Sequence, residues 1–138
     1  MLEEVERFLD EWEDTALQVK KSFVVLKSYV ADKADLTFNF KARPGVSYSL
    51  RAKHRLQKSR ELFLIMDVID EPENRWLSIC FYPDMITDPG DKGVLIPLGL
   101  LGEDGYCFDL EEWDETYLQY LKIRLDEAYK NASKKNKD

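Results

Sequence analysis

Apolar residues recur at alternating steps of four and three along residues 2–31, which predicts one long N-terminal helix. No glycine or proline interrupts it, although its β-branched last third, 22–30, also fits a strand. A stripe this long either packs across a sheet or joins two copies of the chain, with Phe8 and Trp12 in the interface. The stripe consists of Val5, Leu9, Trp12, Ala16, Val19, Phe23, Leu26 and Val30, widened by Phe8.

The next pattern has the period of two that β-strands produce. Residues 36–43 and 46–53 alternate around Pro44-Gly45, a pair that favours a type II turn, so this segment is predicted to be a hairpin. The apolar side of the hairpin holds Leu36, Phe38, Phe40, Ala42, Val46, Tyr48, Leu50 and Ala52. Its polar side holds Thr37, Asn39, Lys41, Arg43, Ser47, Ser49, Arg51 and Lys53.

Two further strands are predicted at 61–70 and 75–82, joined by a turn at 71–74 and preceded by a connection at 53–60. The first of them has apolar residues of both parities, which is typical of a central strand covered on both faces.

Residues 83–105 are expected to form a long loop, because they hold five of the six glycines and three of the five prolines. A short strand at 94–96 and a fifth strand at 106–110 are the regular elements expected in or after it. A second helix is predicted from about 110 to 132, and a disordered basic tail at 133–138.

Together these elements predict a single α+β domain over residues 1–132. Its four- to five-stranded antiparallel meander is flanked by the long N-terminal helix and the C-terminal helix. The order helix, meander, helix resembles that of frataxin and of the YjbR-type small domains. The resemblance is one of topology only, so it transfers no functional residues.

Composition excludes several classes of protein. The net charge of −7 argues against a nucleic-acid binder, and no apolar run could cross a bilayer. The N-terminus has the pattern of neither a secretory signal nor a transit peptide, so we expect a cytoplasmic location. In that compartment Cys80 and Cys107 are expected to be reduced, buried and inert. With His54 as the single histidine, no metal site and no cofactor are expected.

Charge is distributed very unevenly along the chain. Residues 36–60 contain seven of the 20 Lys and Arg residues and none of the 27 Asp and Glu residues. The resulting candidate site consists of Lys41, Arg43, Arg51, Lys53, Ser47 and Ser49, because guanidinium groups and hydroxyls bind phosphates and carboxylates. The competing interpretation is a solvated face, with Arg51 neutralised by Asp67 inside the protein.

Other chemistry has little support. The glycine-rich 99–105 lacks a P-loop pattern, the acids at 84–104 do not have EF-hand spacing, and the chain contains no [DE]xK triplet of a restriction-type nuclease.

The sequence therefore favours a non-enzymatic binding or regulatory module that meets an anionic small molecule or an acidic protein surface. Two alternatives stay open: a small enzyme with its site beneath 83–105, and a homodimeric interaction protein that uses the N-terminal helix.

Overall fold

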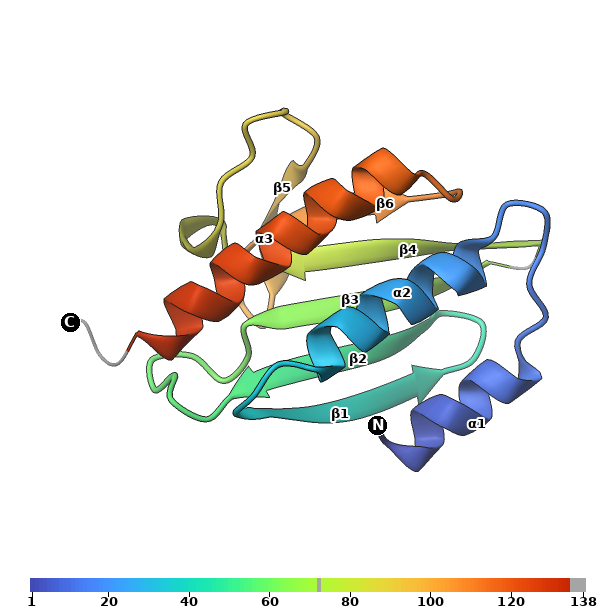
Figure 1. Ribbon diagram of the computed structural model, residues 1–138, viewed down its shortest axis with the longest axis horizontal. Coiled ribbons are helices and arrows are strands. Elements are labelled where there is room, and N and C mark those ends of the chain that lie inside the picture. The colour runs from blue at the N-terminus through green and yellow to red at the C-terminus, as the bar shows by residue number, and fades with distance from the viewer. Residues whose placement is uncertain (72, 135–138) are drawn as a thin grey trace.

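Residues 1–71 and 73–134, which this computed structural model describes, form one six-stranded antiparallel sheet with three α-helices on one of its faces (Figure 1). The strands lie in the order β1-β2-β3-β4-β6-β5. The α+β class with an antiparallel sheet is confirmed, and the sheet has six strands rather than four to five. The elements are α1 (Glu3–Glu11), α2 (Val19–Ala31), β1 (Leu36–Arg43), β2 (Ser47–His54), β3 (Leu64–Glu71), β4 (Asn74–Phe81), the 3-10 helix η1 (Pro83–Met85), β5 (Val94–Leu100), β6 (Glu103–Leu110) and α3 (Glu115–Ser133).

The prediction of one helix over 2–31 is wrong, because the chain turns between α1 and α2. The carboxylate of Asp14 accepts hydrogen bonds from the backbone N–H groups of Thr15, Lys20 and Lys21, so it caps the start of α2 instead of lying inside a helix. Gln18 adopts a left-handed backbone, with φ at 58°. Both helices nevertheless bury their parts of the predicted stripe, whereas Ala16 in the break is exposed.

The hairpin of β1 and β2 is confirmed. Gly45 has φ at 84°, and the N–H of Val46 donates to the carbonyl of Arg43 at 2.8 Å, as expected for a type II turn with Pro44 at its second position. β3 is a central strand, since it pairs with β2 on one side and β4 on the other.

The segment 83–105 contains more regular structure than the long loop predicted from its glycines and prolines. β5 and β6 form a tight hairpin in which Leu100 pairs with Glu103. Leu101 and Gly102 both have positive φ, at 52° and 86°, which is the geometry of a type I′ turn. Because β6 rather than β5 pairs with β4, the sheet is not a simple meander.

The helices pack on the face that carries the even-numbered residues of β2, β3 and β6 and the odd-numbered residues of β4. Phe23, Met66, Leu77 and Phe108 are each 0 % exposed in this layer. α3 begins after Asp114, whose side chain accepts from the N–H of Tyr117, and it continues to Ser133. The predicted tail therefore overlaps the end of α3, and residues 135–138 lie outside the described residues.

No helix among the described residues is long and apolar enough to cross a membrane.

Candidate functional site

The sheet face that points away from the helices, here called the open face, carries all six residues that the sequence proposed as a binding site. In Figure 1 the helices lie in front of the sheet, so the open face is its rear surface. Lys41 pairs with Ser49 and Arg43 with Ser47, and alternate residues of a strand share a face. The two serines are nearly buried between their longer neighbours, at 5 % and 2 % exposed.

Four cations form what we call the basic cluster: Lys41, Arg43, Arg51 and Lys53. Within the described residues, no carboxylate forms an ion pair with any of them. Arg51 is half-buried, and its Nε donates to Ser49 Oγ at 3.1 Å, while the other three side chains are exposed. The charges of the cluster therefore have no described carboxylate within ion-pair distance.

The neighbouring arginines show the opposite arrangement. Arg55 bonds Asp35 at 2.9 Å, Arg75 bonds Asp70 at 2.9 Å, and Arg60 bonds Asp84 at 2.8 Å and Glu103 at 3.1 Å. Arg60 also stacks on the ring of Tyr82, and Arg75 lies over the rings of Phe8, Trp12 and Tyr48. The chain thus uses these arginines to hold its own loops and helices, which distinguishes them from the basic cluster.

Asp67 lies at the centre of the open face, between Ser49 on β2 and Ser78 on β4. Burial raises the pKa of its carboxyl, while Ser49 and the positive charges of Arg51 and Arg43 act in the opposite direction. Its Oδ1 is buried without a hydrogen-bond partner in the described chain. The internal Arg51–Asp67 ion pair considered from the sequence is not formed, so Asp67 does not neutralise the basic cluster by direct contact.

A hollow of about 790 Å³ opens beside the basic cluster, between the start of β1 and residues 53–61. Lys53 belongs to both the cluster and the hollow, and Lys58 adds a second lysine without a carboxylate partner among the described residues. The basic run 53–60 in the sequence could have indicated that the basic surface continues into this hollow, although its pattern predicts only a connection.

His54 also lines the hollow, although its ring lies in the core. Its Nδ1 accepts from the N–H of Leu56 at 3.0 Å, so its Nε2 carries the proton, and Nε2 has no partner among the described residues. Burial lowers the pKa of this imidazole.

In the first half of 83–105, the polar side chains form hydrogen bonds with groups of the same chain. Asp88 accepts from the N–H groups of Lys92 and Gly93 and from the hydroxyls of Tyr106 and Tyr120. Although burial opposes ionisation, these four donors hold the pKa of Asp88 well below its usual range. The same contact with Asp88 raises the pKa of Tyr106 to about 12. With its oxygens occupied, Asp88 closes the segment onto β6 and α3 instead of presenting a free acid or base.

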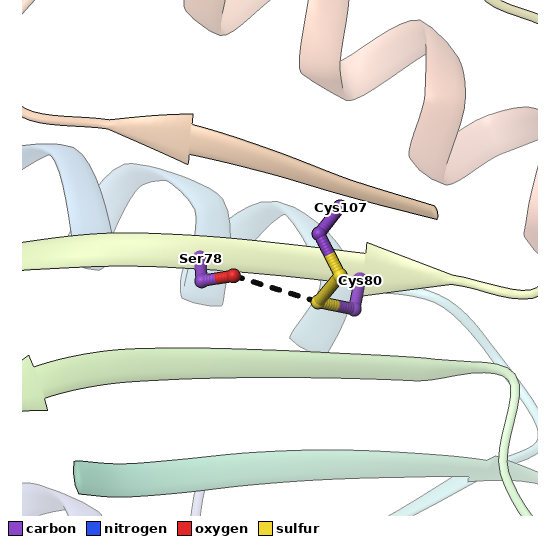
Figure 2. Close-up of a disulfide and its surroundings, with 3 residues drawn as sticks. All are labelled: Ser78, Cys80 and Cys107. Atoms are coloured by element: carbon purple, nitrogen blue, oxygen red, sulfur yellow. Dashed lines mark hydrogen bonds between the residues drawn. A yellow bond between two sulfur atoms is a disulfide. The ribbon is translucent and has the colours of Figure 1, made fainter. Parts of the chain in front are cut away.

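The prediction that the cysteines are reduced is wrong, although both are buried as predicted: Cys80 and Cys107 form a disulfide bond on the open face (Figure 2). The two residues lie directly opposite each other on β4 and β6. The Ser78 hydroxyl lies 3.5 Å from Cys80 Sγ. The sequence separation of 27 residues gave no indication of this pairing, which depends on the register of two strands that are not consecutive.

No group of three or more His, Cys, Asp or Glu side chains in the described part of the chain is arranged to hold a metal ion.

No family model, curated protein or solved structure matches this chain. The order helix, meander, helix on which the resemblance to frataxin and YjbR-type domains rests differs from the structure, which has two helices before the strands and a sheet that is not a simple meander.

Proposed function

We propose that this protein is a non-enzymatic binding or regulatory module whose basic cluster holds an anionic partner, either a small anion or an acidic protein surface. The observation that carries the proposal is the contrast between two sets of cations. Arg55, Arg60 and Arg75 are each paired internally, whereas the four members of the basic cluster stand together on the open face with no ion pair among the described residues.

Electrostatics supports binding at this position. Four like charges on two adjacent strands repel one another, and a bound phosphate or carboxylate would relieve that repulsion. Guanidinium groups bind such anions through two parallel hydrogen bonds, and Lys41 and Lys53 add point charges at the exposed edge. The net charge of −7 argues against nucleic acid as the partner, because its phosphate backbone would meet repulsion from most of the remaining surface.

The test is a titration of inorganic phosphate, a nucleotide and an acidic peptide, followed by the amide signals of residues 37–53. At least one of these probes should shift those signals in the native protein, and added salt should suppress the shift. Binding should survive the loss of one base and fail in Arg43→Ala/Arg51→Ala.

Lys20→Ala/Lys130→Ala is the matched control, since it removes the same charge from α2 and α3 and should bind normally. If none of the three probes shifts residues 37–53, the basic cluster is ordinary surface and the proposal is wrong.

The two alternatives receive less support. Phe8 and Trp12, offered as interface residues for a dimer through the N-terminal helix, are 8 % and 6 % exposed and pack inside the monomer. A small enzyme beneath 83–105 would need a free titratable group there, and the oxygens of Asp88 are already bonded.

A cytoplasmic location remains part of the proposal. The Cys80–Cys107 disulfide is the observation that weighs against it, because stable disulfides are typical of oxidising compartments.

A further inference from the structure

Charge divides the open face into two halves. The basic cluster lies on β1 and β2, at one side of the sheet. On the other side, Asp109 of β6 and Glu111 just after it are exposed, and neither forms an ion pair within the described residues. Asp109 and Glu111 are two residues apart at the end of β6, and burial together with the charge of Glu111 raises the pKa of Asp109. The face thus contains both a basic half and a smaller acidic half.

From this arrangement we infer that the anionic partner is a second copy of this chain, packed open face to open face about a two-fold axis parallel to the strands. The inference rests on the proposed function, because it names the partner of the basic cluster.

The charges select this axis. When two identical sheets pack face to face with their strands aligned, the in-plane two-fold axis is either perpendicular or parallel to the strands. A perpendicular axis places β1 over β1 and basic cluster over basic cluster, which is repulsive. A parallel axis reverses the strand order, so that β2 lies over β6 of the second copy and the basic half meets the acidic half.

The register of the sheet then matches residue with residue. Lys41, Ser49, Asp67, Ser78 and Asp109 form one row across the strands. In the dimer this row lies over the same row of the second copy, read in the opposite direction. Ser49 then lies over Asp109 of the second copy, and Lys41 can reach that carboxylate. Asp67 lies over the Ser78 hydroxyl of the second copy.

One of the two adjacent rows is complementary as well. In it Ile69 would meet Trp76 of the second copy, and Arg43 would approach its Glu111. In the other row, Ile65 and Cys80, which are 7 % and 8 % exposed, would lie opposite each other, and Arg51 would lie over the second copy's disulfide at Cys107.

Exposed apolar side chains give this packing its driving force. Val94 is 59 % and Ile96 41 % exposed, and both pair with open-face residues of β6, so they share that face. In the reversed register Asn39 of the second copy lies over Val94, and the aliphatic stem of Lys41 in the adjacent row would cover its flank. Six strands of about eight residues span roughly 700 Å² per copy at the strand spacing and rise of β-sheets, which is an upper limit for the area that this face can bury and lies near the size of a standard interface.

The experiment is a charge swap read by sedimentation at micromolar protein. One variant is Lys41→Glu/Arg43→Glu, and the other is Asp109→Lys/Glu111→Lys; all four positions are exposed, so both variants should fold. We expect a native dimer, two monomeric variants, and recovery of a dimer when the variants are mixed, because each glutamate then faces a lysine. The control Lys20→Glu/Lys130→Glu makes the same charge change on the helices and should stay dimeric.

A native monomer, persistence of dimers in both variants, or no recovery on mixing would overturn the inference. The proposed function is separated from it by titrating phosphate and the acidic peptide against Asp109→Lys/Glu111→Lys, whose basic cluster is intact. Binding there, together with a monomeric native protein, would keep the function and reject the second copy as partner. If the native protein dimerises but Asp109→Lys/Glu111→Lys binds neither phosphate nor the acidic peptide, the second copy stays the partner and only binding of an external anion is rejected.

Discussion

Asp67 is the charged residue that the fold accommodates least well. Because burial raises its pKa, the folded state holds the proton more tightly than the unfolded chain, whose carboxyl titrates near 3.8. Protonated Asp67 therefore contributes fully to the free energy of unfolding below that pH. This contribution is lost as the pH rises through the folded-state pKa. We predict that Asp67→Asn stabilises the protein at neutral pH and that the gain vanishes in acid.

Urea unfolding at fixed protein concentration, repeated across pH, measures this effect. Asp32→Asn is the control, since that carboxyl is exposed at the end of α2. If Asp67→Asn is instead less stable than the native protein at neutral pH, the ionised carboxylate of Asp67 must be stabilised by a partner group when the protein is in solution.

The second prediction at the scale of residues concerns Cys80 and Cys107. Without reductant, we expect no free thiol in either native or denatured protein, and two thiols after reduction. Replacing both cysteines with alanine should lower the free energy of unfolding by about 2–4 kcal/mol, because the crosslink restricts the unfolded chain. Thiol counting and urea unfolding provide the two measurements. Free thiols in the unreduced denatured protein would contradict the disulfide.

Among the elements, α2 depends on a residue outside its own length. Asp14 accepts from the N–H groups of Lys20 and Lys21, both at 3.1 Å, and so satisfies donors that the first turn leaves unpaired. Asp14→Ala should destabilise the protein by about 1 kcal/mol, as the loss of an N-terminal cap does. Asp10→Ala, which removes an exposed carboxylate of α1, should have a smaller effect in the same thermal unfolding measurement.

The segment between η1 and β5 is held by Asp88. Since four donors converge on its carboxylate, Asp88→Asn should cost about 1.5–3 kcal/mol and speed amide exchange in residues 86–93. The matched control is Asp91→Asn, in the same segment, because asparagine tolerates the positive φ found there. Unchanged exchange in Asp88→Asn would show that the backbone alone holds the segment.

At the scale of the whole molecule, one core connects both N-terminal helices to the sheet. Phe23 of α2 is 0 % exposed, and its ring centroid lies 6.5 Å from that of Phe8 and 6.1 Å from that of Trp12. Phe23→Ala should therefore destabilise the protein by about 3–5 kcal/mol in a single cooperative transition. Ser28→Ala, at an exposed position of the same helix, is the control. Two separate transitions would show that α1 unfolds independently.

The sequence by itself determined several features that depend on neighbours along the chain. The alternation of 36–53 and the Pro44-Gly45 turn were sufficient for the first hairpin and for the common face of the basic cluster, and the apolar residues of both parities in 61–70 were sufficient for the central position of β3. These follow from the pleat and from backbone conformation, which act over a few residues.

Local patterns failed where a polar side chain or an unusual turn interrupts them. Asp14 divides a continuous apolar stripe into two helices, and Leu101-Gly102 forms a hairpin turn without the usual Asn-Gly or Asp-Gly signal. Only the tertiary structure decided the pairing of β6 with β4. That pairing brings Cys80 to Cys107 and places Asp67 in a row with Asp109. The physical reason is that strand register joins residues far apart in the chain, and their distances and burial depend on the whole sheet.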